Sequence, residues 1–324
     1  MEKRKKIEEP VAAEFKQFED EFLTSLSSST VLLQSAIDKI MNSTGKHIRP
    51  LLVLLTAKAC GKINETTINS SVLLELLHTA SLIHDDVIDE TKERRGEPSL
   101  NAFYDNRVSV LVGDYILSSA LVRSIQTGNI RIMTIVSEVG RGLSEGEIRQ
   151  IEVVEDIILD EQAYLQIIEK KTAMLISACS EIGAISAGAD DEIIGRFKTI
   201  GRYLGFCFQI KDDIFDYFSD TKIGKPTGND ILEGKVTMPL LFALRNASSE
   251  ESGKYKDIIL NREFTPQNIS ELISFAKANG GIEYAEMKMK EYKEKATALL
   301  DELPHSEAKE SLIFLADYII QREK

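Results

Sequence analysis

The stretch HTASLIHDDVIDE, residues 78 to 90, places aspartates inside apolar sequence that recurs at intervals of three and four. A second stretch, GFCFQIKDDIFDY at residues 205 to 217, repeats the same aspartate spacing. Apolar residues at this period predict helices with a buried side, whereas carboxylates one turn apart repel each other. Desolvating an unpaired charge is also costly. Both sets of aspartates therefore need a positive partner.

The same apolar period continues through most of the chain, which predicts an all-α fold because alternation of period two is nearly absent. Pro50 suits an early helical position and Gly61 suits the end of that helix. The longest predicted helical segments are residues 66–90, 107–124, 162–187 and 191–218. The predicted loops are residues 91–99, 219–238 and 247–255.

The organisation of the chain points to one helical domain over residues 1–324, with a flexible end at residues 1–10. No repeat of fixed period, low-complexity tract or long linker divides the sequence. The composition also has 43% hydrophobic residues, which is enough for a sizeable core.

Charge and cysteine content exclude several classes of protein. The 39 basic and 52 acidic residues give a net charge of −13, which argues against a general nucleic-acid surface. The 3 cysteines are widely spaced and form no CxxC pair, so neither a disulfide framework nor a zinc site is predicted. The basic N-terminal end lacks an apolar leader segment, and no stretch reaches the roughly 20 apolar residues of a membrane span. We therefore expect a soluble, cytoplasmic protein without stable membrane insertion.

The first aspartate helix divides into a core face and a cavity face at about 100° per residue. The core face gathers Leu73, Leu76, Leu77, Ala80, Ile83 and Val87. The other face carries Leu74, His78, Ser81, Leu82, Asp85 and Asp89, with Glu75 and Asp86 at its margin. This second face is apolar toward its N-terminal end and acidic toward its C-terminal end, as the wall of a cavity with a charged mouth would be.

The aspartates form two triads that suit magnesium. Mg²⁺ is usually held by one or two carboxylates together with phosphate oxygens and waters. The triads are Asp85, Asp86 and Asp89, and Asp212, Asp213 and Asp216. One such triad alone is well explained as a solvated helix face, but two copies with identical spacing favour a polyphosphate bound through bridging metals.

Basic residues follow or precede these triads in the sequence. Arginine forks suit phosphate oxygens, lysine supplies a point charge, and exposed amides at a helix start favour anions. Each residue alone is as well explained by the protein surface, whereas their joint placement favours phosphate binding. The candidates are Arg94, Arg95, Lys225, Lys235, Lys46 and Arg49.

The order of the motifs resembles the trans-isoprenyl diphosphate synthases, the polyprenyl synthetase family. The motifs are GKHIRP, ELLHTASLIHDDVIDE, RRGEPS, GDYILSSAL, EKKTAMLI, FQIKDDIFDY and EGKVTMP, and the resemblance runs from about Gly45 to the C-terminus. Thr44 and His47 depart from the family pattern, which often has glycine and arginine there. The resemblance implies a bundle of long helices around a deep central cavity, and a homodimer.

The resemblance also implies a reaction, the magnesium-dependent condensation of isopentenyl diphosphate with an allylic diphosphate. Both triads would hold about three Mg²⁺ ions on the allylic diphosphate, with Asp213 and Asp216 contributing less. Its remaining oxygens would be bound by Arg94, Lys171, Lys225 and Lys235. Isopentenyl diphosphate would be bound by Lys46, Arg49, His78 and Arg95. Thr172 and Gln209 would present oxygens toward the cationic carbon, and the basic end at Arg322 and Lys324 would close over the isopentenyl site.

His78 has a second reading, because a lone histidine in a helix is more often a satisfied core residue. Its place two turns before Asp85, on the predicted cavity face, favours the substrate role.

Small residues before the first triad predict a long product. In this family a bulky aromatic at the positions of Ala80 and Ser81 typically stops elongation early, and both residues are small here. Leu74 lies about 11 residues before Asp85, roughly 16 Å down the helix at 1.5 Å per residue, and we expect it to form the tunnel floor with Met133. The implied product is an all-trans heptaprenyl or octaprenyl diphosphate.

Other functions remain open at the level of sequence. A farnesyl or geranylgeranyl diphosphate synthase results if another residue blocks the tunnel. A class I terpene cyclase shares the first triad, but DDIFD at residues 212–216 differs from its usual second site. A non-catalytic subunit commonly loses one triad, and this chain keeps both. The simplest alternative is an acidic helical scaffold that binds divalent ions.

Overall fold

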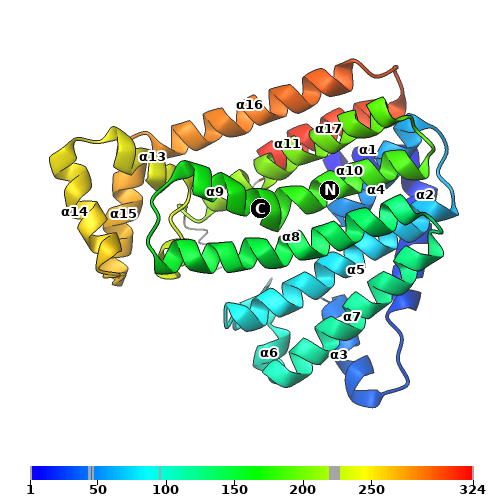
Figure 1. The fold of residues 1–324 in the computed structure, drawn as a ribbon, viewed down its shortest axis with the longest axis horizontal. Coiled ribbons are helices and arrows are strands. Elements are labelled where there is room, and N and C mark those ends of the chain that lie inside the picture. The colour runs from blue at the N-terminus through cyan, green and yellow to red at the C-terminus, as the bar shows by residue number, and fades with distance from the viewer. Residues whose placement is uncertain (1, 43–44, 46, 95, 219–226, 323–324) are drawn as a thin grey trace. The chain divides into compact units, whose positions relative to one another are not determined.

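The computed structural model describes residues 2–42, 45, 47–94, 96–218 and 227–322 of the 324-residue chain. Helices dominate these residues, which confirms the predicted all-α fold (Figure 1). Contacts divide the chain into two compact units, each built from several segments. Unit 1 comprises Met1–Gly140, Ala178–Thr199 and Glu302–Leu315. Unit 2 comprises Arg141–Ser177, Ile200–Asp301 and Ala316–Lys324.

The elements fall into these units in chain order. Unit 1 contains α1 (Glu2–Glu8), η1 (Glu9–Val11), α2 (Ala12–Ser25), α3 (Val31–Asn42), α4 (Ile48–Cys60), α5 (Glu65–Ile88), β1 (Glu93–Arg94), β2 (Glu97–Pro98), α6 (Leu100–Phe103) and α7 (Asn106–Gln126). Unit 2 contains α9 (Glu161–Ile168), η2 (Glu169–Ala173), α12 (Asn229–Leu232), α13 (Met238–Asn246), α14 (Ser249–Leu260), α15 (Pro266–Ala278) and α16 (Gly281–Asp301). Residues of both units belong to α8 (Ile130–Glu155), α10 (Met174–Ser186), α11 (Asp191–Phe215) and α17 (Glu307–Gln321).

The core of unit 1 forms around α5, which lies alongside α4 and α7 (Figure 1). Asn64 caps α5 by accepting a hydrogen bond from the amide of Thr67, and the Thr67 side chain accepts one in return. The predicted core face is buried, with the exception of the half-buried Val87. Leu74, placed on the cavity face, is also fully buried. The buried side of α5 is therefore wider than the predicted stripe.

The segment predicted as a loop at residues 91–99 forms a short antiparallel hairpin of β1 and β2. Gly96 occupies its turn with a φ of 81°, a conformation that glycine adopts without strain. The hairpin carries Arg94 back toward the end of α5.

Helices also occupy parts of the other predicted loops. The prediction for residues 247–255 is wrong, because Ser248 caps α14 by accepting a hydrogen bond from the amide of Glu251. Within residues 219–238, α12 forms a short helix after Gly228.

The N-terminal end, predicted to be flexible, is helical at α1. Ile7 is 2% exposed, and the Lys6 ammonium lies 4.5 Å from the centre of the Phe314 ring. Burial of an apolar residue and a cation–π contact thus hold this segment within unit 1.

In the described part of the chain, α7 is long and apolar enough to cross a membrane by length and composition. The prediction that no segment reaches this length is therefore wrong. Apolar core helices of soluble proteins pass the same test, so α7 is weak support for a membrane span. Its Val112, Ile116 and Ala120 are buried in unit 1.

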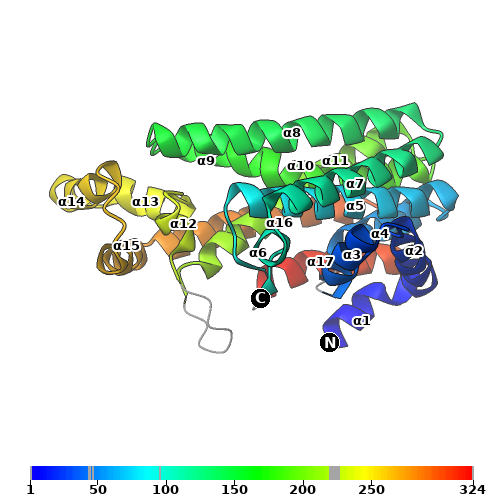
Figure 2. The same cartoon turned by 90° about the horizontal axis from the view of Figure 1, so that it is seen from below.

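Close backbone packing shapes unit 2 around η2 and α11. The turn η2 is a π-helix, a wide turn that is frequent at functional sites. A Cβ atom at Gly205 would lie 2.4 Å from the Ala173 Cα atom, so only glycine allows α11 and η2 to approach so closely. Elsewhere in this unit, α13, α14 and α15 lie together in both views (Figures 1 and 2).

Candidate active site

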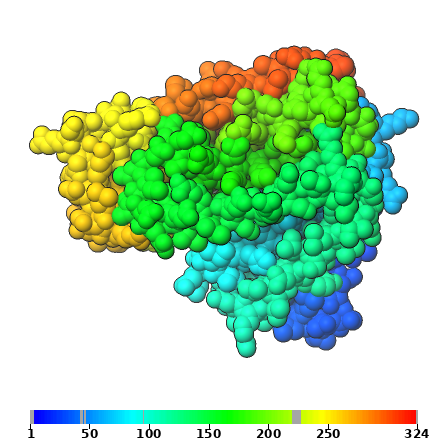
Figure 3. Space-filling view, viewed as in Figure 1, coloured from blue at the N-terminus to red at the C-terminus, as the bar shows by residue number. Residues whose placement is uncertain are grey.

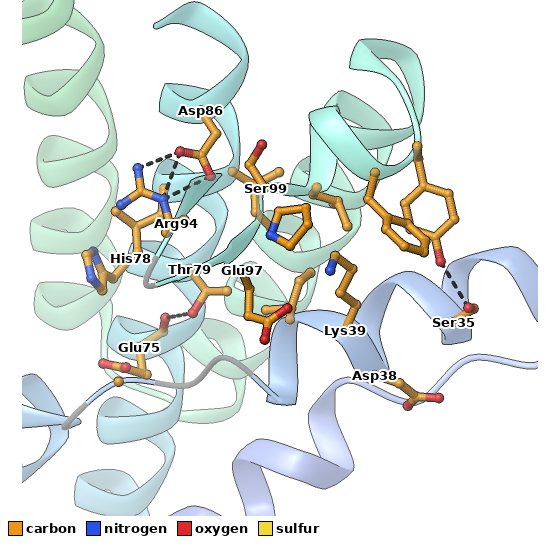
Figure 4. Close-up of a pocket in the computed structure, with 18 of the residues that line it drawn as sticks. Ser35, Asp38, Lys39, Glu75, His78, Thr79, Asp86, Arg94, Glu97 and Ser99 are labelled. Atoms are coloured by element: carbon orange, nitrogen blue, oxygen red, sulfur yellow. Dashed lines mark hydrogen bonds and ion pairs between the residues drawn. The ribbon is translucent and has the colours of Figure 1, made fainter. Parts of the chain in front are cut away.

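A cavity of about 500 Å³ in unit 1 opens beside the C-terminal half of α5 (Figure 4). Its polar wall combines residues from α3, the start of α4, α5 and the β1–β2 hairpin. The polar and charged lining residues are Ser35, Asp38, Lys39, His47, Glu75, His78, Thr79, Asp86, Arg94, Glu97, Ser99 and Tyr104. Of the residues predicted to bind phosphate, Arg94 and His78 line this cavity. The predicted cavity face of α5 is met only in part, because Ile83 of the predicted core face lines the cavity whereas Ser81, Asp85 and Asp89 do not.

Asp86 and Arg94 form a close ion pair at this cavity (Figure 4). Arg94 Nε donates to both carboxylate oxygens, at 2.8 and 2.9 Å, and Nη2 lies 2.6 Å from Oδ1. Asp86 is 5% exposed, whereas the Arg94 side chain is 36% exposed. Arg94 thus neutralises a buried member of the first triad while its side chain stays partly exposed.

His47, which stands where the family often has arginine, anchors the start of α4. Its backbone is left-handed, with a φ of 42°, and its ring packs edge-on against Phe18 and Phe22. His47 Nδ1 lies 2.9 Å from Oε1 of the buried Glu75 on α5. This contact ties the start of α4 to the cavity wall.

The structure places the residues predicted to bind isopentenyl diphosphate in different surroundings. His78 is half-buried and lines the cavity, as the substrate role requires. Arg49 lies in the first turn of α4 and is half-buried. Lys46 and Arg95 lie outside the described residues.

Lys39 of α3 is a cavity cation that the sequence reasoning missed. It is half-buried, and its ammonium lies 4.5 Å from the centre of the Phe103 ring. The only sequence signal was a basic residue in the last turn of the helix that precedes GKHIRP.

The second triad lies in unit 2, and its first member pairs with the C-terminal end of the chain. Arg322 Nη2 donates to Asp212 Oδ1 at 2.7 Å and to the Phe208 carbonyl at 3.0 Å. The guanidinium also lies 4.0 Å from the centre of the Phe208 ring. In this structure Arg322 is therefore paired with Asp212. Lys324 lies outside the described residues, so closure of this end over the isopentenyl site stays a prediction.

Asp213 is buried and accepts hydrogen bonds at both oxygens. Tyr164 donates to Oδ2 at 2.5 Å, and Gln209 Nε2 donates to Oδ1 at 2.8 Å. Burial raises the pKa of this carboxyl to about 7, while the hydrogen bonds from Tyr164 and Gln209 act in the opposite direction. Thr172 joins the same network by donating to Gln209 Oε1 at 2.6 Å. The structure thus brings together Thr172 and Gln209, as their shared predicted role requires.

Asp216 accepts hydrogen bonds from backbone amides at the start of α12. Asn229 N lies 3.1 Å from Oδ1, and Asp230 N lies 3.1 Å from Oδ2. Burial, followed by the charges of Asp213 and Asp216, raises the pKa of the Asp230 carboxyl well above its usual value. Asp230 is a further acidic residue beside the triad that sequence reasoning missed, since it falls inside a predicted loop.

The predicted diphosphate-binding lysines of unit 2 contact glutamates in this structure. Lys171 Nζ lies 2.5 Å from Glu147 Oε2 and donates to Gln150 Oε1 at 3.1 Å. Lys235 Nζ lies 2.5 Å from Glu233 Oε2. Lys225 lies outside the described residues.

The residues of the described ranges do not by themselves gather three or more histidine, cysteine, aspartate or glutamate side chains around one possible metal position. This donor set still fits Mg²⁺, because that ion needs only one or two carboxylates and takes its other ligands from phosphate and water. Half-buried Asp85 and buried Asp86, on the last turn of α5, supply such oxygens.

Two of the four predicted chain-length residues lie within the packed interior of unit 1. Leu74 and Ala80 are buried, whereas Ser81 and Met133 are half-buried. Ser81 donates its hydroxyl to the His78 carbonyl at 2.9 Å. Their effect on product length stays a prediction.

Comparisons with known proteins agree with the order of motifs. The family model described as polyprenyl synthetase matches residues 30–276. Octaprenyl diphosphate synthase of Escherichia coli (strain K12) is 34% identical over 321 residues, which are 98% of this chain and 99% of that protein.

Solved structures show the same fold over nearly the whole chain. A polyprenyl synthase from Caulobacter crescentus CB15, crystallised with calcium and isoprenyl diphosphate, has a TM-score of 0.93 and 30% identity, covering 99% of this chain and 98% of that chain. A geranylgeranyl pyrophosphate synthase from Bacteroides thetaiotaomicron has a TM-score of 0.87 and 41% identity, covering 99% of this chain and 100% of that chain. The chain therefore belongs to the polyprenyl synthetase family.

Proposed function

We propose that this prenyltransferase adds isopentenyl diphosphate repeatedly to an allylic diphosphate and makes a long all-trans polyprenyl diphosphate. In each cycle the allylic carbon–oxygen bond breaks and diphosphate leaves with the electron pair. The isopentenyl double bond then forms the new carbon–carbon bond, and the proton lost from isopentenyl is taken by the departed diphosphate. The observation that carries this proposal is the cavity of unit 1, whose wall joins His78 to the Asp86–Arg94 pair.

The aspartates of both triads are the proposed metal ligands, and about three Mg²⁺ ions would be bound with the diphosphate. When bound, the metal stabilises the negative charge that develops on the leaving diphosphate. Asp213 and Asp216 contribute less, because their oxygens already accept hydrogen bonds from protein groups. The calcium in the Caulobacter crescentus protein supports a divalent ion in this role.

Cationic side chains are proposed to bind the two diphosphates. Arg94, Lys171, Lys225 and Lys235 serve the allylic substrate, while Lys46, Arg49, His78 and Arg95 serve isopentenyl diphosphate. Arg94, Lys171 and Lys235 each contact a carboxylate in this structure, so short ion pairs orient these side chains. Thr172 and Gln209 offer oxygens to the allylic cation, and exclusion of water protects that cation from quenching.

The long product is supported by the Escherichia coli octaprenyl diphosphate synthase and by the small side chains of Ala80 and Ser81. The 41% identity to a geranylgeranyl pyrophosphate synthase favours the shorter product as the second candidate. The cytoplasmic location also stays a proposal, and it fits the free thiols of Cys60, Cys179 and Cys207, which a reducing compartment preserves.

Chain extension can be tested directly with labelled isopentenyl diphosphate, farnesyl diphosphate and Mg²⁺. We expect extended prenyl diphosphates, sized by chromatography after removal of the phosphates. Chelation of the metal should abolish the reaction and added Mg²⁺ should restore it, because diphosphate departure needs charge neutralisation. A cyclised hydrocarbon would identify a terpene cyclase instead, and no product would favour a non-catalytic subunit or a scaffold.

A homodimer is proposed to form through the outer face of α7, part of which lies at the surface in Figure 3. Leu111, Val122 and Ile125 share this side of the helix and are 68%, 55% and 64% exposed. An apolar stripe of this kind is typical of a protein–protein interface, and paired copies of one surface are the commonest symmetric assembly.

Charged substitutions on this face should separate the dimer. The double variant Leu111→Glu with Ile125→Glu is expected to sediment as a monomer, because it would place carboxylates in an apolar contact. Leu260→Glu is the matched control, since Leu260 is 53% exposed on α14 and belongs to unit 2. A wild-type chain that sediments as a monomer would contradict the proposal.

A further inference from the structure

A continuous chain of hydrogen bonds in unit 2 leads from a tyrosine to a residue proposed to contact the reacting carbon. Tyr164 of α9 donates to Asp213, Gln209 donates to the other Asp213 oxygen, and Thr172 donates to Gln209. The distances are 2.5, 2.8 and 2.6 Å. Tyr164 lies outside the motifs from which the site residues were assigned.

The chemistry of these groups fixes the orientation of the Gln209 amide. Gln209 Nε2 donates to Asp213 Oδ1, so the side of the amide that faces Asp213 is its nitrogen. Gln209 Oε1 then faces Thr172 and accepts the hydroxyl proton. Because that proton is committed to Gln209, the lone pairs of Thr172 Oγ1 are left for another positive group.

Packing makes this orientation rigid. Asp213 is 4% exposed and Tyr164 is 7% exposed, so water does not readily replace either partner. The close approach of Gly205 to Ala173 holds η2, which carries Thr172, against the helix that carries Gln209. The three hydrogen bonds therefore form within a closely packed part of unit 2.

We propose that Tyr164 is a positioning residue for prenyl transfer, which acts through Asp213 to hold the Gln209 amide with its nitrogen toward Asp213 and its oxygen toward Thr172. Thr172 Oγ1 then keeps its lone pairs for the allylic cation. Asp213 is then primarily a hydrogen-bond acceptor for Tyr164 and Gln209, and only secondarily a metal ligand. This inference rests on the proposed function, because those oxygens matter only if an allylic cation forms.

The first experiment compares Tyr164→Phe with the wild-type enzyme in the chain-extension assay. The substitution removes one oxygen and keeps the buried ring. We expect kcat to fall by about tenfold to a hundredfold, as for other residues that orient a metal-site ligand, with KM for both substrates unchanged. Tyr217→Phe is the matched control, because Tyr217 is also buried in unit 2 and its hydroxyl lies 3.2 Å from the Thr237 hydroxyl instead.

A double-variant cycle separates positioning from a loss of stability. In a Gln209→Leu background, Tyr164→Phe should have no further effect on kcat, because the amide that Tyr164 orients is gone. Effects that multiply, or a Tyr164→Phe enzyme with the kcat of Tyr217→Phe, would overturn the inference. An inactive wild-type enzyme would instead defeat the proposed function.

Asp213→Asn provides a second test that holds even if Tyr164→Phe does not fold. Asparagine can turn either its oxygen or its nitrogen toward Gln209, so the orientation is no longer fixed. We expect a lower kcat at an unchanged half-saturating Mg²⁺ concentration. A shift to higher Mg²⁺ would show that Asp213 acts as a metal ligand and would contradict its assignment as a positioning group.

Discussion

Replacing Asp86 with asparagine should lower kcat for chain extension by about a thousandfold, similar to the loss of a group that stabilises charge in the transition state. Asparagine keeps the shape of the side chain but removes a negative charge from the first triad. The diphosphate-bound metal would then lose a ligand that offsets its charge. We expect the half-saturating Mg²⁺ concentration to rise in the same variant, measured by steady-state kinetics at fixed substrate.

The Asp86→Asn variant should change catalysis and not the stability of the fold. Arg94, the partner of Asp86, has a side chain that is 36% exposed and can turn toward water after the substitution. The melting temperature should therefore change little. Asp20→Asn is the matched control, because Asp20 lies exposed on α2 of the same unit. An Asp86→Asn enzyme with wild-type kcat would remove the first triad from the proposed metal site.

The helical architecture could be predicted because apolar periodicity reports burial on one side of a helix. The segments 66–90 and 107–124 correspond closely to α5 and α7. The start of α14 was missed because its first turn is polar, and only Ser248 three residues before Glu251 marks the cap. The width of the buried side of α5 also escaped prediction, since Leu74 is buried by neighbours that periodicity within one helix does not reveal.

Spacing along one helix could predict which residues share a face, and His78 and Asp86 do line the cavity of unit 1. The metal-binding role of both triads stays a prediction. Hydrogen-bond partners distant in sequence were not predictable in this way. Tyr164 is separated from Asp213 by 49 residues, and Arg322 from Asp212 by 110. His47 departed from the family pattern, but its contact with Glu75 depends on the packing of α4 against α5. Such partners are fixed by tertiary structure and leave no local signal.

The product should shorten to farnesyl or geranylgeranyl length when Ala80 is replaced by phenylalanine. If the small side chains at Ala80 and Ser81 leave room for the growing prenyl chain, an aromatic ring at this depth blocks further addition. Chromatographic sizing of the products measures this effect directly, and the rate of the first condensation should change much less than the product length.

Because Ala80 is buried, a second variant is needed to separate a blocked tunnel from a disturbed core. Ala80 is 1% exposed, so the added ring can overpack the core at a cost of about 1–3 kcal/mol. Ser81 is half-buried, so Ser81→Phe should shorten the product with a smaller loss of melting temperature. Ala13→Phe adds the same ring at an exposed position of α2 and should leave the product unchanged. If both α5 variants fold and still make the wild-type product, the elongating chain does not pass this face of α5, and a residue elsewhere sets its length.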